Sequence, residues 1–262
     1  MVERGGHGLP GRRRGLHLRH TSPSRPDQLQ VAARHRALGF EPVIGRFAAQ
    51  RRGLIELLQD QGIRDLAILR AFDLVPRHEF LPEAVRHRAY EDAALPIGLA
   101  QTASQPSLQA LYMELLRLQP HERVLEVGTG SGFQTAVLAQ LVRNVHSVER
   151  LRPLAIRARE ALDRLQISNV AILVGDGTIG WSRYAPYDAI LVTAGSPTIP
   201  EPLVRQLRIG GRMIVPVGTM DSQKLMMVVR TNESYEADEV LACSFVPLLG
   251  RFGWTEREGS AD

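Results

Sequence analysis

The 262-residue sequence predicts an α/β protein built on a doubly wound, mostly parallel β-sheet. Residues 124–149 read as strand, glycine turn, helix and strand, which is the pattern of one βαβ unit. Further apolar runs follow at regular intervals with helical patterns between them, as in sheets covered by helices on both faces. N-terminal helices and a closing antiparallel strand pair complete the predicted fold. Ligands of such sheets bind outside the carboxyl ends of the strands, at the point where the strand order reverses.

The glycine turn of this unit indicates a nucleotide-like ligand. Three glycines follow the first strand, namely Gly128, Gly130 and Gly132. Without a Cβ atom they let the backbone turn sharply and approach a ligand closely. The predicted helix 135–142 and second strand 145–148 then lead to Glu149, 21 residues after Gly128 (149 − 128). A carboxylate at that place can bind ribose hydroxyls.

The residues around the turn favour one nucleotide over the others. Phe133 stands where a dinucleotide fingerprint has its third glycine. Glu126, just before the turn, would repel a pyrophosphate but could face a sulfonium or an ammonium group. This combination fits S-adenosylmethionine, which is positively charged and has no phosphate. A glycine turn in an unrelated α/β protein and an NAD site remain as alternatives.

The segments before the unit predict two helices and a loop. One amphipathic helix runs from Arg46 to near Gly62, and a second spans residues 65–72 and is stopped by Pro76. Residues 94–106 read as a loop because of their Pro and Gly content. Ser104 is expected to cap the helix 107–118, since a serine before a proline at the first helical positions is a helix start signal.

The segments after the unit predict the rest of the sheet: helix 153–165, strands 170–174 and 187–195, helix 201–207, strand 212–217, and a closing pair 223–230 and 240–248 with a turn around Asn232. Asp176, between Gly175 and Gly177, can accept a hydrogen bond from the exocyclic amine of an adenine. Thr193 is expected beside the methyl donor. Four polar residues thus fall at carboxyl ends of strands: Glu126, Glu149, Asp176 and Thr193.

Composition limits the other classes of function. The basic excess lies in the Arg-rich residues 1–50, so residues 1–45 read as a basic, disordered extension, 46–250 as the main domain and 251–262 as a frayed tail. A single cysteine, Cys243, excludes an internal disulfide, and no Cys/His spacing indicates zinc. No apolar run has the length of a membrane span and no signal peptide is recognisable, so a cytoplasmic protein is expected.

Several motifs together resemble the protein-L-isoaspartate O-methyltransferases, a family of class I methyltransferases with a Rossmann-like fold. The resemblance covers about residues 46–250, in order and at family spacing. Its motifs are Pro96-Ile97-Gly98 with Gln101 to Pro106, Val124 to Thr135, His146 to Arg150, Gly175 to Gly177, Tyr187 to Ile190, Gly210 to Arg212, and Phe245 to Leu248. The loop around Ser104 is much more specific than the glycine turn.

The resemblance implies transfer of a methyl group from S-adenosylmethionine to the free α-carboxylate of L-isoaspartyl residues in damaged proteins. Ser104 matches the active-site serine of the family. The cofactor positions of the family map onto Thr102, Ser104, Ser131, Glu149, Arg150, Asp176 and Gly177, beside the glycines of the turn. Isoaspartyl proteins and peptides would be the partners, and a monomer is expected.

Four residues depart from the family pattern around the substrate cleft: Leu99, Ala100, Ala103 and Leu249. They leave open a specialised relative that methylates an aspartate in one dedicated peptide. A cofactor-binding adaptor without turnover is a further alternative. A nucleic-acid methyltransferase is disfavoured because the Asn/Asp-Pro-Pro-Tyr motif and a Pro-Cys nucleophile are absent, although the basic extension keeps nucleic acid open as a partner.

Overall fold

The computed structural model describes residues 47–255. The predicted basic extension, residues 1–45, lies outside the described residues, as do residues 256–262. The described residues belong to a single compact unit of the chain.

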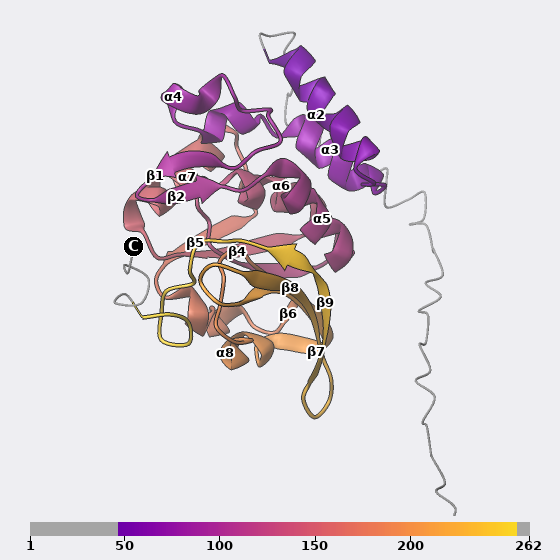
Figure 1. The fold of residues 1–262 in the computed structure, drawn as a ribbon, viewed down its shortest axis with the longest axis vertical. Helices are drawn as coiled ribbons and strands as arrows, with labels where there is room; N and C mark the ends of the chain where they lie inside the picture. Colours follow the sequence, from indigo (N-terminus) through magenta and orange to yellow (C-terminus); the bar gives the residue numbers. More distant parts are fainter. Residues whose placement is uncertain (1–46, 256–262) are drawn as a thin grey trace, which may run out of the picture. The chain divides into compact units, whose positions relative to one another are not determined.

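A seven-stranded sheet forms the centre of this unit, with the strand order β5-β4-β3-β6-β7-β8-β9 (Figure 1). The five strands β5, β4, β3, β6 and β7 are parallel to one another, whereas β8 is antiparallel to β7 and to β9. The predicted doubly wound sheet with a closing antiparallel pair is therefore confirmed. The strands are β3 Arg123–Val127, β4 Asn144–Glu149, β5 Val170–Val174, β6 Tyr187–Val192, β7 Leu207–Gly218, β8 Gln223–Arg230 and β9 Tyr235–Cys243.

The order reverses beside β3, because the chain moves outward through β4 and β5 and then returns to place β6 on the other side of β3. Both faces of the central strands are buried. Ala189 and Leu191 of β6 belong to one apolar cluster, and Ile190 and Val192 belong to the other. Alternate side chains of a strand point to opposite faces, so an uninterrupted apolar run is what a doubly covered strand requires.

The helices follow the predicted pattern, except for the four-residue helix Glu83–Arg86 and three short 3-10 helices that the sequence did not indicate. They are α2 Ala48–Asp60, α3 Leu66–Leu74, α4 Glu83–Arg86, α5 Pro106–Leu116, α6 Phe133–Leu141, α7 Arg152–Arg164 and α8 Glu201–Val204, with short 3-10 helices η1 Arg77–Phe80, η2 Gly177–Ile179 and η3 Ser182–Tyr184. The N-terminal helices α2 and α3 contact α5 and α6 (Figure 1). Asp65 begins α3 by accepting hydrogen bonds from the amides of Ala67 and Ile68.

The segment predicted as a loop, residues 94–106, contains an antiparallel hairpin instead. Strands β1 Leu95–Gly98 and β2 Gln101–Ala103 pair with each other and form a sheet of their own. Burial of Leu95, Ile97 and Ala103 orders the segment despite its Pro and Gly content. The turn between the strands has Leu99 and Ala100 at φ 55° and 54°. Two left-handed residues are what a two-residue hairpin turn needs, but side chains make that conformation costly.

Four further predictions near the C-terminus are corrected. The last strand is β9 Tyr235–Cys243 rather than residues 240–248, although the turn around Asn232 is present. Helix α8 is shorter than predicted and β7 begins earlier, at Leu207. The tail does not fray at residue 250, because Leu249 bridges to Trp254 and the Trp254 indole donates to the carbonyl of Gly195 at 3.1 Å.

The hairpin turn gives a first test of the fold. Ala100→Gly should raise the free energy of unfolding by about 1 kcal/mol, since glycine reaches a left-handed φ without the steric cost that alanine has there. For a domain of this size the melting temperature should rise by about 2–4 °C. The matched control is Ala84→Gly in α4, which should lower stability. A lower melting temperature for Ala100→Gly in thermal unfolding would contradict the strained turn.

Candidate active site

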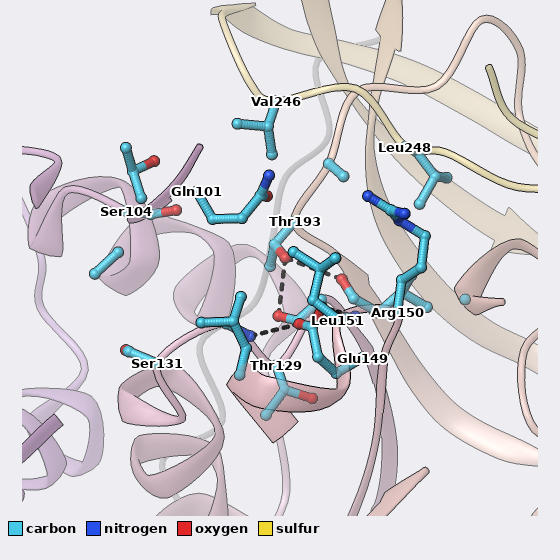
Figure 2. A pocket seen from close by; sticks show the side chains of 18 of the residues that line it. Gln101, Ser104, Thr129, Ser131, Glu149, Arg150, Leu151, Thr193, Val246 and Leu248 are labelled. Carbon is cyan, nitrogen blue, oxygen red and sulfur yellow. Dashed lines mark hydrogen bonds between the residues drawn. The ribbon is translucent and has the colours of Figure 1, made fainter. Parts of the chain in front are cut away.

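A cavity of about 330 Å³ lies at the carboxyl ends of β3, β4 and β6, where the strand order reverses. Figure 2 shows Ser104 and Ser131 on one side of it, Glu149 and Arg150 on the other, and Val246 and Leu248 along a third edge. The structure therefore brings together nine of the twelve predicted residues in the cavity wall: Thr102, Ser104, Gly128, Gly130, Ser131, Glu149, Arg150, Gly177 and Thr193.

The glycine turn forms the floor of the cavity and is held from two sides. Gly128 has φ 97°, and a Cβ atom there would collide with the hydroxyl of Thr193. That hydroxyl donates to the carbonyls of Val127 and Gly128, at 2.9 and 3.1 Å. The amide of Gly130 donates to Glu149 Oε2 at 2.8 Å. The backbone therefore reaches the cavity without a side chain in front of it.

Glu149 ends β4 in the cavity wall, as predicted. Its Oε1 accepts a hydrogen bond from the amide of Leu151 at 2.9 Å, and its Oε2 accepts the Gly130 amide. An ionised carboxylate has about four acceptor positions, so two remain for hydroxyl donors in the cavity. Two backbone hydrogen bonds fix the carboxylate in place, and a vicinal diol of a ribose is the donor set that such a group recognises.

Glu126 is not where the sequence placed it. It is fully buried behind the floor and does not line the cavity. Its carboxylate accepts hydrogen bonds from Thr135 Oγ1 at 2.5 Å, Ser147 Oγ at 2.6 Å and Gln134 Nε2 at 3.1 Å. It therefore ties helix α6 and strand β4 to β3 instead of facing a sulfonium. Burial raises the pKa of Glu126 to about 7, against the lowering effect of these hydrogen bonds.

Asp176 and Gly132 also lie outside the wall. The Asp176 carboxylate caps η2 by accepting the amide and the hydroxyl of Thr178, at 2.8 and 2.6 Å, and it accepts the amide of Arg251 at 2.8 Å. Asp176 is therefore not in the predicted place, although the neighbouring Gly177 does line the cavity. Gly132 instead lets α6 pack on α7, because a Cβ atom there would be 2.9 Å from that of Ala158.

Ser104 lies at the end of the hairpin and does not cap α5. The N-cap residue is Gln105, without a side-chain cap, and Asp92 Oδ1 accepts the amide of Ser107 at 2.8 Å in its place. The capping prediction is therefore wrong. The Ser104 carbonyl accepts from Arg77 Nη2 at 3.0 Å, while its hydroxyl has no hydrogen-bond partner among residues 47–255. A half-buried hydroxyl in a cavity wall is then available for a ligand.

Of the cavity wall formed by residues 246–249, the sequence had placed only Leu249 near the site. The segment Val246 to Leu249 is held by backbone hydrogen bonds to Gly195, in which the Gly195 amide donates to Val246 and the Leu248 amide donates to Gly195, both at 2.8 Å. The Phe245 to Leu248 motif was the signal for this wall. Further lining residues that the sequence did not single out are Gln109, Leu151, Leu154 and Ala194.

Within the described part of the chain, no group of His, Cys, Asp and Glu side chains could hold a metal ion. No described helix is long and apolar enough to cross a membrane.

The strand order, the glycine turn after β3 and the carboxylate that ends β4 define the class of S-adenosylmethionine-dependent methyltransferases with a Rossmann-like sheet. A family model described as protein-L-isoaspartate(D-aspartate) O-methyltransferase matches residues 49–253. The chain belongs to the protein-L-isoaspartate O-methyltransferase family.

Individual relatives agree with this membership. A protein-L-isoaspartate O-methyltransferase of Geobacter metallireducens is 47% identical over 214 residues, which covers 81% of this chain and 99% of the relative. One of Magnetococcus marinus is 50% identical over 214 residues, covering 81% and 93%.

Solved structures agree as well. One protein-L-isoaspartate O-methyltransferase has a TM-score of 0.73 at 34% identity, covering 78% of this chain and 67% of that chain. A Plasmodium falciparum structure described by the same activity, in complex with S-adenosyl-L-homocysteine, has a TM-score of 0.68 at 26% identity, covering 76% and 98%.

The buried carboxyl of Glu126 predicts a pH dependence of stability. Its pKa is about 7 when folded against 4.5 ordinarily, so between these values the folded chain holds a proton that the unfolded chain has lost. The free energy of unfolding should therefore fall as pH rises from about 4.5 to 7, by on the order of 2–3 kcal/mol.

Urea unfolding between pH 4.5 and 8 measures this effect. Glu126→Gln should remove the pH-dependent part, and Glu56→Gln, on the exposed surface of α2, should leave it in place. A constant stability difference between wild type and Glu126→Gln across this range would show that Glu126 titrates normally.

Proposed function

We propose that this chain transfers the methyl group of S-adenosylmethionine to the free α-carboxylate of L-isoaspartyl residues in proteins and peptides. The observation that carries the proposal is the partnerless hydroxyl of Ser104 in the same cavity as the glycine turn and Glu149. One part of the cavity suits a nucleoside, and the other presents a hydroxyl donor to an anionic group.

The cavity residues fit the cofactor through their chemistry. Glu149 would hold the ribose hydroxyls, while the glycine turn with Ser131 would accommodate the amino-acid end of the cofactor through its main chain. Thr102, Arg150, Gly177 and Thr193 complete the cofactor wall. The bound cofactor supplies a methyl group already activated by a sulfonium.

The chain itself has to position the acceptor more than activate it. An α-carboxyl group has a pKa of about 3.5, so it is ionised at neutral pH and needs no general base. Ser104 donates a hydrogen bond to one carboxylate oxygen, which leaves the other free to attack the methyl carbon. With the cofactor bound, the carboxylate would gain the methyl group as the carbon–sulfur bond breaks, and the product would be a neutral thioether. Because the acceptor only has to be oriented, the cavity needs no paired nucleophile and general base.

We further propose that the chain acts as a monomer in the cytoplasm. Every residue assigned above comes from one chain, so the cavity needs no second copy. Cys243, the single cysteine, is free, as is usual in a reducing compartment.

The proposed activity is tested with methyl-labelled cofactor and two peptides that differ only in an isoaspartyl or aspartyl residue. The isoaspartyl peptide should be methylated, and the aspartyl peptide should be a far poorer acceptor. A preference for the aspartyl peptide would support a specialised relative. Cofactor binding in calorimetry without turnover on either peptide would support an adaptor.

Ser104 gives a sharper test within the site. Because it does not cap α5, Ser104→Ala should change the melting temperature little but lower kcat by about 10- to 100-fold through misorientation of the acceptor. Ser104→Asp should fold and bind cofactor but methylate very poorly, since two carboxylates would face each other. Ser168→Ala, exposed and outside the cavity, is the control. Near-normal turnover by both Ser104 variants would remove Ser104 from the catalytic machinery.

A further inference from the structure

Arg77 is a fully buried arginine whose guanidinium binds only backbone. It donates to the carbonyls of Ala89 at 2.8 Å, Glu91 at 3.2 Å, Ala93 at 3.4 Å and Ser104 at 3.0 Å. Among residues 47–255 no carboxylate lies within ion-pair distance of it. Burial lowers the pKa of Arg77 to about 10, which reflects the cost of a charge removed from water without a direct counter-ion.

The four carbonyls belong to the two ends of the β1–β2 hairpin. The first three lie on the segment 89–93 that enters β1, and the fourth belongs to Ser104, directly after β2. One side chain therefore joins the entry and the exit of a hairpin that shares no strand pairing with the seven-stranded sheet. The planar fork of a guanidinium can serve several fixed acceptors at once, which a lysine ammonium cannot match in geometry.

The same guanidinium also contacts the first residue of the helix that follows the glycine turn. Its central carbon lies 5.6 Å from the ring centroid of Phe133, within the range of a cation–π contact. Phe133 is the first residue of α6, directly after the glycine turn. Arg77 thus contacts both the residue that carries the catalytic hydroxyl and the residue next to the cofactor floor.

Asp92 supports the same junction from the surface side. Its carboxylate accepts hydrogen bonds from the side-chain amide of Gln105 and from the amide of Ser107, both at 2.8 Å. These contacts join the entry of β1 to the first turn of α5, on the other side of Ser104. We call Arg77 and Asp92 together the hairpin clasp.

We propose that Arg77, with the support of Asp92, is a positioning residue that sets the place of the Ser104 hydroxyl relative to the glycine turn. The inference rests on the proposed function, in which Ser104 orients the acceptor carboxylate. A displacement of about 1 Å at such a group can cost about 100-fold in rate. The clasp thereby acts on catalysis through Ser104 and touches neither substrate nor cofactor.

The test uses the full chain with Arg77→Lys and a matched control, Arg159→Lys. Arg159 also bridges backbone carbonyls, those of Val170 and Ile167 at 3.0 and 3.1 Å, but it lies outside the cavity. The measurements are the melting temperature, the calorimetric Kd for cofactor, and kcat and KM for the isoaspartyl peptide at saturating cofactor.

For Arg77→Lys we expect kcat to fall by about 10- to 100-fold per folded molecule, while the cofactor Kd stays within about threefold. Arg159→Lys should lower the melting temperature without changing kcat. Unchanged kcat and KM in folded Arg77→Lys, or an equal loss of kcat in both variants, would overturn the positioning role.

If Arg77→Lys does not fold, Asp92→Ala provides a second test. Asp92 lies nearer the surface than Arg77, so its substitution should leave the core intact. It should lower kcat by about three- to tenfold at nearly unchanged cofactor Kd. A wild-type kcat in Asp92→Ala would overturn the proposed positioning role of the hairpin clasp. The wild-type chain in the same assay separates the two proposals, since its failure to methylate the isoaspartyl peptide would refute the function itself.

Discussion

The close packing of neighbouring elements against the glycines around the cavity floor is the constraint on which the rest of the cavity depends. Gly128 leaves room for the Thr193 hydroxyl at the end of β6, and Gly132 leaves room for Ala158 of α7. Gly177, after β5, lies against Val127 in the same way. A Cβ atom at any of these glycines would push apart the strand and helix ends that form the floor. The cavity exists because this floor is backbone.

Two acids of the same βαβ unit hold this floor and have opposite environments. Glu126 lies beneath it with three hydrogen bonds and a raised pKa, whereas Glu149 lies in the wall with two backbone hydrogen bonds. The first joins β3 to β4 and α6, and the second fixes the edge of the turn. Only Glu149 keeps acceptor positions that face the cavity, so hydrogen-bond partners and burial decide which acid can meet a ligand.

The hairpin lies outside the seven-stranded sheet and leads directly into Ser104, the residue that the proposed mechanism places against the acceptor. Its alternating buried side chains attach it to the helices, and its ends are joined by Arg77. This arrangement has two energetically unfavourable features, namely the left-handed backbone of Leu99 and Ala100 and the buried guanidinium of Arg77. Strain and buried charge persist where the surrounding structure holds them in place, and such places gather at functional sites.

The order of the sheet strands and main helices, the glycine turn and the position of Glu149 could be read from the sequence, although the bounds of α8, β7 and β9 could not. These features rest on short-range patterns, since apolar periodicity and glycine spacing act over a few residues. The hairpin was missed because three- and four-residue strands with Pro and Gly carry too few alternating positions to be distinguished from a loop.

The directions of Glu126 and Asp176, the freedom of the Ser104 hydroxyl and the burial of Arg77 could not be read from the sequence. A carboxylate at a strand end can turn toward a cavity or away from it, and its direction depends on donors that are distant in the sequence. Thr135 and Ser147 hold Glu126, Arg251 holds Asp176, and Ser104 lies 27 residues from its partner Arg77. The residue type and its position were readable from the sequence, whereas the partners that fix each side chain are brought together only by folding.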